Sequence, residues 1–523
     1  MKKIYNNKFF NITTISIFII SLYSFIINFY FASFGVYPVD TFLHYDSAYR
    51  ILSGELPVRD YWIVSGFIIE FLQSIFFKIF GVNWTAYILH SSIINIIISI
   101  LCYFFFLSLK ISLLNSLIYA LSFSTLAYSV SGTPFVDHHA VFLLLMSSFL
   151  MYKFFDQANN KINLFLILLL SFSSFLIKQV PVGYAFFLQG ALILFYILKY
   201  KKLKLLKRIF LYLFIILIFF FIFLIILKIN FKLFIKEYIF YPSSIGSERV
   251  LFFNKSLEIF FNQYKFLIFP ILLTIYTKFK LNLSSIKQES NEVFKYLIIL
   301  FLSVALIFHQ LLTKNQIFIY FLIPIFFGIL NKDLNIIFPK IKKIISGILV
   351  IFLLSITLKY HLRYNEQRKF HELSRVNFNN TVEAENIHNS LKGLRWINPF
   401  FRGKPQKEIE LIKEGVNQLE NQKDNLMLVS HYLFINSITK KNMNLPTRTF
   451  TIDGASYPLV NNKYFSEFKK FLRNHLKKKG IKKVYFFNHE NLNKNIITDY
   501  LSKDCIKVKK NKLFTIFEIT CLN

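Results

Sequence analysis

Long apolar segments recur along the chain up to about residue 360, and they constrain the fold more than any other feature. Crossing a membrane takes about 20 mostly apolar residues. Hydrophobic residues make up 55% of the chain and mean hydropathy is +0.48, which excludes a disordered chain and argues against a purely soluble one. We therefore predict a polytopic α-helical membrane protein. About eleven segments predict spans: 11–32, 86–107, 112–130, 139–154, 162–177, 182–198, 209–227, 258–277, 296–312, 316–330 and 344–359.

The charge of the chain predicts its orientation. With 61 Lys and Arg against 28 Asp and Glu, the net charge is +33. Such an excess often indicates nucleic-acid binding. Here, however, the cations cluster between apolar segments, most clearly within 199–208, and we predict no nucleic-acid partner. Cations are concentrated on the side of the N-terminus, which the positive-inside rule places in the cytoplasm. An odd number of spans then places the C-terminal region outside the plasma (inner) membrane, in the periplasm if the cell is bacterial.

The composition becomes polar after about residue 359, which predicts two domains: a membrane domain over 1–359 and an extra-cytoplasmic α/β domain over 360–523. Alternating strands and helices favour a small α/β fold there. Its predicted elements are strands at 425–430, 481–487 and 512–520 and an amphipathic helix over 464–479, which ends before Gly480. The other long exposed segment, about 33–85, follows the first span. It contains predicted short helices over 46–53 and 67–80, each followed by a glycine.

Three cysteines are too few for a disulfide framework. Cys102 lies in an apolar segment, where we expect inert packing. Cys505 and Cys521 flank a predicted hairpin near the C-terminus, which would bring them within disulfide distance. In an oxidising compartment we expect them to pair.

Polar and charged residues gather at four places, all at the outer face of the predicted topology. The first group lies in the loop after the first span: Asp40, His44, Asp46, Tyr49, Arg50 and Asp60. Asp46, Tyr49 and Arg50 share one helical face. A carboxylate at a membrane-edge cavity can deprotonate a hydroxyl acceptor. Alternatively, Asp40 and Asp46 cap helices, and Asp60 pairs with Arg59 or lies in a turn.

The second group is Asp137, His138 and His139, where the fourth span begins. Asp137 is a plausible helix cap. The histidines make a metal site with His44 or Asp46 conceivable, but adjacent histidines point in different directions on a helix, and we predict no metal.

The remaining two groups add cations at the same face. Lys178 and Gln179 end the fifth span before a Pro and a Gly, so Lys178 either snorkels or binds an anion. His309, Lys314 and Gln316 belong to a polar run that predicts a tight outside turn. Acids and cations converging on one face suit a substrate with a lipid tail and a phosphate head, such as a polyprenyl-phosphate sugar.

With these residues the chain resembles the GT-C glycosyltransferases, in the branch of protein O-mannosyltransferases and aminoarabinose transferases. The resemblance covers about 1–360. Asp46-Ser-Ala-Tyr49 is similar to the acidic motif of the first outer loop, with Ser47 where a second acid often stands. Asp137 is similar to the second acidic position. Phe175-Leu-Ile-Lys178 with Pro181 resembles the Lys-Gly-Pro motif, with Gln179 in place of Gly, and the stretch from Lys314 to Pro324 resembles the Lys-Tyr-Leu-Pro motif.

This resemblance implies an inverting transfer of a sugar from a polyprenyl-phosphate carrier to an envelope lipid, glycan or protein. Asp46 would be the general base, and Asp60 and Asp137 would orient sugar or acceptor hydroxyls. Arg50, Lys178 or Lys314 would stabilise the leaving phosphate. The residue pattern leaves open whether Asp40, Asp46 or Asp60 is the base. No cofactor or divalent ion is expected.

Three other functions remain possible at this stage. A flippase or transporter of lipid-linked glycans would place ionisable residues near mid-membrane, often in repeated halves, whereas here they lie at the outer edge and no repeat is evident. A polysaccharide polymerase or ligase typically carries its large outer loop late in the chain. A non-catalytic scaffold would use the outer domain to bind partners.

Overall fold

The computed structural model describes residues 2–156, 160–246, 253–283, 291–313, 318–451 and 454–521. The chain forms two compact units. The first comprises Met1–Ala32, Ile88–Phe219 and Leu251–Ser374, and the second comprises Ser33–Tyr87, Phe220–Val250 and Arg375–Asn523. The structure therefore groups the outer loop with the C-terminal region. The division predicted from composition instead cuts the chain once, between residues 359 and 360, and leaves the outer loop in the membrane domain.

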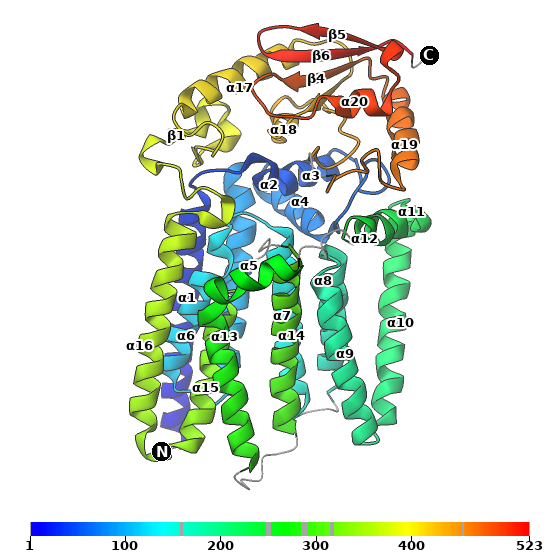
Figure 1. The fold of residues 1–523 in the computed structure, drawn as a ribbon. Helices are drawn as coiled ribbons and strands as arrows, with labels where there is room; N and C mark the ends of the chain where they lie inside the picture. Colours follow the sequence, from blue (N-terminus) through cyan, green and yellow to red (C-terminus); the bar gives the residue numbers. More distant parts are fainter. Residues whose placement is uncertain are drawn as a thin grey trace. The chain divides into compact units, whose positions relative to one another are not determined.

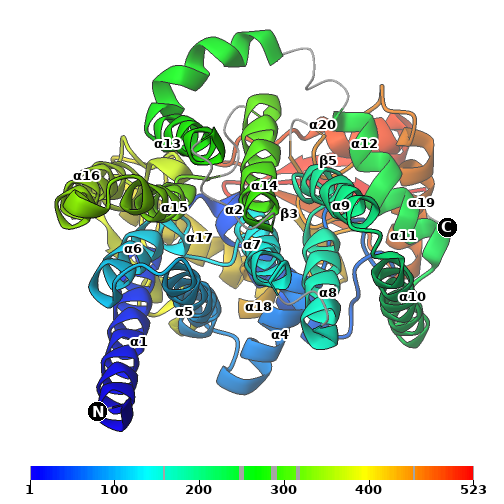
Figure 2. The ribbon, with the colours of Figure 1, turned by 90° about the horizontal axis from the view of Figure 1, so that it is seen from below.

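The first unit is helical because its segments are long and apolar, and Figure 2 shows its helices lying together as a bundle. Each predicted span has a helix over most of its length. The helices are α1 (Lys2–Ala32), α6 (Leu113–Leu126), α7 (Val136–Phe154), α8 (Lys161–Ile177), α9 (Val182–Lys199), α13 (Phe253–Leu283), α14 (Asn291–Thr313), α15 (Leu322–Ile337) and α16 (Lys342–His361), with most of α5 (Trp84–Ser108) and α10 (Leu203–Ile226).

Among the described residues, seven helices are long and apolar enough to cross a membrane: Asn11–Ala32, Trp84–Ser108, Leu113–Val130, Val182–Lys199, Leu203–Ile226, Asn291–Thr313 and Pro339–Glu366. Polar side chains join them inside the bundle. Asn28 of α1 donates to Ser92 of α5 over 2.9 Å, and Asn331 of α15 donates to Tyr119 of α6 over 3.0 Å. Such bonds tie apolar helices together where the hydrophobic effect between them is weak.

The second unit contains the helices of the outer loop and the C-terminal sheet. Its helices are α2 (Pro38–Thr41), α3 (Leu43–Leu52), α4 (Ile68–Phe80), α11 (Phe231–Ile235), α12 (Tyr241–Gly246), α17 (Pro405–Glu420), α18 (Ile435–Ile438), α19 (Phe465–Lys478) and α20 (Asn495–Tyr500). Its strands are β1 (Val382–Glu383), β2 (Arg395–Trp396), β3 (Leu426–Val429), β4 (Lys483–Phe487), β5 (Ile506–Lys510) and β6 (Phe514–Ile519).

The larger sheet has the strand order β3-β4-β6-β5, in which β3 and β4 are parallel and the other pairs are antiparallel. Figure 1 shows β4, β6 and β5 side by side in that order. Helix α17 packs closely on this sheet at Gly415, where a Cβ would overlap the ring of Phe487.

The predicted strands and the amphipathic helix are all present within a few residues of their expected bounds. The predicted fold class, a polytopic helical membrane protein with a small C-terminal α/β domain, is thus confirmed.

The outer loop is bound to the C-terminal region by backbone hydrogen bonds. Gly35 and Val36 donate to the carbonyl oxygens of Arg395 and Ile397 over 3.0 and 2.9 Å, and Trp62 donates to Pro446 over 2.8 Å. Although these segments are far apart in sequence, they fold as one unit, and this unit positions the loop's functional side chains.

Candidate functional site

Helix α3 carries the acidic motif of the outer loop. It begins at Leu43 after Phe42, whose side chain makes no capping hydrogen bond, and it ends at Leu52, with Ser53 as the C-cap residue before Gly54. Gly54 has φ +88°, a left-handed conformation that glycine adopts without strain. Asp46 is therefore the fourth residue of the helix and lies inside it. The alternative interpretation of Asp46 as a helix cap is wrong, because the helix starts earlier than the acidic residue.

Asp46 is a buried carboxylate, 1% exposed, whose two oxygens differ in their surroundings. Oδ1 accepts a hydrogen bond from Nδ2 of Asn436 over 2.8 Å. Oδ2 has no hydrogen-bond partner among the described residues. Burial raises the pKa of Asp46 to about 7, against the opposing effects of Arg50 and Asn436. This carboxyl group can therefore accept a proton near neutral pH.

The orientation of the Asn436 amide is fixed by its own acceptor. Its Oδ1 accepts the backbone N–H of Met443 over 3.1 Å, and a backbone N–H can only donate. The amide nitrogen must therefore face Asp46. Asn436 lies in α18 of the C-terminal region, so this region supplies a direct hydrogen bond to the acidic motif.

Each of the three side-chain nitrogens of Arg50 donates a hydrogen bond to a protein group. Its Nε donates to Glu55 over 2.8 Å, and Nη1 and Nη2 donate to the carbonyl oxygens of Thr447 and Leu445 over 3.0 and 2.7 Å. The guanidinium lies 3.8 Å from the ring centre of Tyr61. Arg50 is 1% exposed. These contacts join the loop to the C-terminal region, and the expected role of Arg50 as a phosphate ligand stays a prediction.

Glu55 completes this ion-pair network. It accepts a hydrogen bond from Lys479 over 2.7 Å as well as from Arg50, and Asn442 donates to it. Burial alone would raise the pKa of Glu55, but the two cations and Asn442 lower it to about 2. Glu55 is therefore ionised at neutral pH, whereas Asp46 titrates there.

His44 belongs to a second buried cluster in the same unit. Its Nδ1 lies 2.9 Å from Oε1 of Glu70, and Nη2 of Arg448 lies 3.0 Å from the same oxygen. Arg448 also donates to the carbonyl oxygen of Gly66 over 2.7 Å. Burial acts to raise the pKa of Glu70, but Arg448 and His44 more than offset it, and the pKa is lowered. His44 thus serves the packing of α3 against α4.

The other loop acids have different surroundings. Oδ2 of Asp60 accepts from the backbone N–H of Leu56 and from Arg59, which lies 2.6 Å away, so Asp60 closes a turn as the alternative interpretation proposed. Asp40 lies in the first turn of the four-residue helix α2 and is half-buried. Tyr49, also half-buried, lies one turn after Asp46 on α3. Of the three loop aspartates that were candidate bases, Asp46 is the one that is fully buried.

In the first unit, Asp137 and Lys178 form an ion pair, with 2.5 Å between Oδ1 and Nζ. Asp137 lies in the first turn of α7, and Lys178 is the C-cap residue that directly follows α8. The side chain of Lys178 is 19% exposed. Gln179 follows it and is half-buried, and its carbonyl oxygen accepts from Gly183 over 2.7 Å. The second acidic position and the lysine motif, 41 residues apart, thus meet.

The neighbouring histidines point in different directions, as expected for adjacent positions on a helix. His138 is surrounded by aromatic rings, and in the described residues neither of its ring nitrogens has a hydrogen-bond partner. His139 faces His90, with 3.0 Å between their Nε2 atoms. In the described part of the chain, no three His, Cys, Asp or Glu side chains gather as a group that could hold a metal ion.

The fourth polar group differs from its prediction. His309 lies inside α14, which continues to Thr313, so the predicted turn does not begin at His309. The reason is that Leu311 and Leu312, both good helix formers, stand between Gln310 and Thr313. Lys314 and Gln316 lie outside the described residues.

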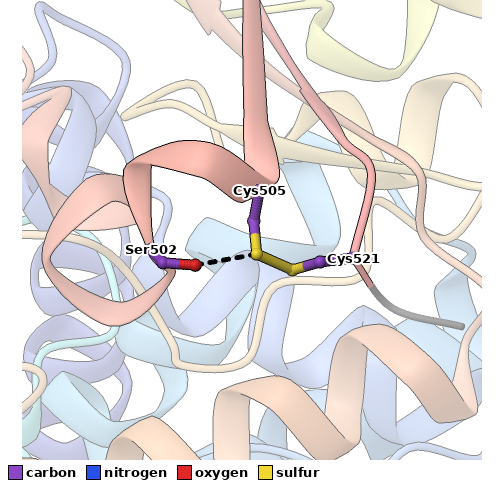
Figure 3. Close-up of a disulfide and its surroundings, with 3 residues drawn as sticks. All are labelled: Ser502, Cys505 and Cys521. Atoms are coloured by element: carbon purple, nitrogen blue, oxygen red, sulfur yellow. Dashed lines mark hydrogen bonds between the residues drawn. A yellow bond between two sulfur atoms is a disulfide. The ribbon is translucent and has the colours of Figure 1, made fainter.

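Cys505 and Cys521 are joined by a disulfide, with 5.0 Å between their Cα atoms (Figure 3). They lie at the two ends of the β5–β6 hairpin, whose antiparallel pairing aligns them. Ser502 is hydrogen-bonded to the sulfur of Cys505 over 2.8 Å. Cys102 is a buried free thiol.

Sequence reasoning missed the residues that the C-terminal region contributes, chiefly Asn436, Arg448 and Lys479. Asn436 stands 390 positions from Asp46, and no local pattern in a polar tail marks one asparagine among many. Glu55 and Glu70 were visible as acids in the loop, but their importance depends on cations from the distant region.

No protein-family model and no curated protein matches the chain. Among solved structures, the chain is similar to the crystal structure of ArnT from Cupriavidus metallidurans bound to undecaprenyl phosphate. That similarity covers 97% of this chain and 98% of the other, at 10% sequence identity and a TM-score of 0.45.

Proposed function

We propose that this protein is an integral membrane glycosyltransferase. It moves a sugar from a polyprenyl-phosphate carrier to a lipid, glycan or protein of the cell envelope, on the outer face of the membrane and with inversion at the anomeric carbon. The observation that carries this proposal is Asp46, a buried carboxylate with one oxygen held by Asn436 and the other without a hydrogen-bond partner among the described residues.

Asp46 suits the role of general base for physical reasons. A base works best when its pKa lies near the working pH, because it is then both ionised and basic. Burial brings the pKa of Asp46 to about 7. The hydrogen bond from Asn436 holds Oδ1, and Oδ2 is the oxygen that has no hydrogen-bond partner among the described residues and is left to accept a proton.

The proposed step balances as follows. The acceptor hydroxyl gives its proton to Oδ2 of Asp46 while its oxygen forms a bond to the anomeric carbon. The bond from that carbon to the phosphate oxygen breaks, and polyprenyl phosphate leaves as an anion. The resemblance gives Arg50, Lys178 or Lys314 as the cation that stabilises this anion. Asp137 accepts one hydrogen bond from the Lys178 ammonium group, which has three N–H donors.

The test of the proposal uses the purified protein in proteoliposomes, supplied with a set of polyprenyl-phosphate sugars and an envelope extract as acceptor. We expect release of polyprenyl phosphate together with a glycosylated product of inverted anomeric configuration. If no donor is consumed and a lipid-linked sugar instead crosses the bilayer, the flippase alternative replaces this proposal.

A further inference from the structure

A basic surface pocket lies where the last long apolar helix ends. Its volume is about 470 Å³. It is lined by Lys359, Leu362, Arg363, Gln367, Lys369 and Ser374, all in the first unit. Three of these six residues are cations and none is acidic, and Gln367 and Ser374 add neutral hydrogen-bond donors. The lining is therefore suited to an anion.

The charges of the pocket are not neutralised by the described protein. Nζ of Lys359 lies 4.5 Å from the ring centre of Phe266, and the Arg363 guanidinium lies 5.5 Å from that of Tyr364. Aromatic rings hold cations in place without cancelling their charge. No ion pair between a carboxylate and either cation or Lys369 occurs among the described residues; the nearby Glu366 instead has its Oε1 3.4 Å from Nε2 of His361. Three cations thus stay available to an outside anion.

An apolar stripe leads along α16 into the pocket. Five residues stand at helical spacing on one face, and their exposed fractions run from 49% at Leu362 to 67% at Ile351: Ile344, Ile348, Ile351, Leu358 and Leu362. Leu362 also lines the pocket. Spacings of three and four residues keep side chains on one helix face. An occupant that carries hydrocarbon chains below an anionic head would fit both features.

The length of the helix places the pocket at the right depth. The candidate span Pro339–Glu366 has 28 residues, or about 42 Å at 1.5 Å per residue, which exceeds the roughly 30 Å of a bilayer's hydrocarbon core. Its last turn, with Leu362 and Arg363, therefore falls at the level of the lipid headgroups. Arginine forms paired hydrogen bonds with phosphate oxygens.

We propose that this pocket binds the phosphate headgroup of an anionic phospholipid whose acyl chains lie along the exposed stripe of α16. This inference does not depend on the proposed glycosyltransferase function, because it uses neither Asp46 nor any residue of the transfer step.

The experiment measures binding of fluorescent phosphatidylglycerol to the purified full-length protein in detergent. Phosphatidylcholine with the same chains and inorganic phosphate serve as competitors. The test variant carries Lys359→Gln, Arg363→Gln and Lys369→Gln. The matched control carries Lys340→Gln, Lys342→Gln and Lys343→Gln, which remove the same charge from exposed lysines at the other end of α16.

We expect the pocket variant to weaken phosphatidylglycerol binding at least tenfold and the control to change it less than twofold. Unlabelled phosphatidylglycerol should compete, and phosphatidylcholine and inorganic phosphate should not. If both variants lose the same amount of binding affinity, the effect comes from the overall surface charge and not from the pocket, and the proposal is overturned. If inorganic phosphate competes with phosphatidylglycerol, the pocket recognises free phosphate, and the proposal of a phospholipid ligand is overturned. If the triple variant is not folded, the single change Arg363→Gln should still weaken binding severalfold, and unchanged binding would refute the site.

Discussion

Truncating Asn436 tests the environment of the proposed base without touching the base itself. In Asn436→Ala, the hydrogen bond from Nδ2 to Oδ1 of Asp46 is lost. That bond stabilises the ionised carboxylate, so its loss raises the pKa of Asp46. Hydrogen bonds to charged groups contribute about 1.5–3 kcal/mol, and one pKa unit corresponds to about 1.4 kcal/mol. The pKa of Asp46 should therefore rise by about one to two units from its value of about 7.

The rate of transfer follows the ionised fraction of the base. At pH 7 that fraction is about one half in the wild type and would fall to about 1–10% in Asn436→Ala, which lowers the rate roughly 5- to 50-fold. Near pH 9.5 the two proteins should differ only slightly. The assay is the initial rate of polyprenyl-phosphate release in proteoliposomes between pH 5.5 and 9.5.

The control for this variant is Asn488→Ala, the same truncation of an asparagine that bonds the backbone of Asn511 elsewhere in the second unit. It should leave the pH profile unchanged. A purely structural role of Asn436 would lower the rate by one factor at every pH. The reasoning is therefore refuted if the acidic limb of the pH–rate profile has the same midpoint in Asn436→Ala as in the wild type.

Three further predictions concern stability. Since the pKa of Asp46 in the folded protein, about 7, lies above its ordinary value of 3.8, folding favours the protonated form, and wild-type stability declines as pH rises from about 4 to about 7. Asp46→Asn should exceed the wild-type thermal midpoint by a small margin at pH 5 and by a wider margin at pH 8.5; the same difference at both pH values would contradict the burial of a charge. Arg448→Met leaves buried Glu70 without its arginine and should cost about 3–5 kcal/mol, seen as a lower midpoint of the second unit's unfolding, whereas a loss below about 1 kcal/mol would show that the pair matters little. Cys505→Ser opens a disulfide loop with a sequence separation of 16 and should cost about 3 kcal/mol, and both cysteines of the non-reduced wild type should resist alkylation.

The periodicity of the sequence predicts the helices well because membrane spans and short strands leave local signals. Each predicted span has a helix, and the glycines at 54 and 81 mark the ends of α3 and α4 at positive φ. The local pattern gave a wrong prediction where the same residues could either continue a helix or form a turn. At His309 a polar run predicted a turn, but the leucines between the polar residues carried α14 on to Thr313.

Only the part of the site that lies within the outer loop could be predicted from the sequence. The acidic motif, with Asp46 and Arg50 one turn apart, is visible in the sequence. What each residue does depends on partners hundreds of positions away: Asn436 holds Asp46, while the carbonyl oxygens of Leu445 and Thr447 occupy Arg50. Backbone carbonyls have no sequence signature, so no pattern could show that this arginine is already occupied.

The central claim is that Asp46 takes the acceptor's proton, and the transfer rate of Asp46→Asn at pH 8 tests it most directly. Asparagine keeps the size of the side chain and an oxygen to accept from Asn436, so the fold is preserved while the base is removed. The loss of a general base typically costs about 10²- to 10⁴-fold in rate, and we predict a loss in that range, with a much smaller one in Asp60→Asn, whose carboxylate closes a turn. An Asp46→Asn protein that transfers sugar at the wild-type rate would contradict the account.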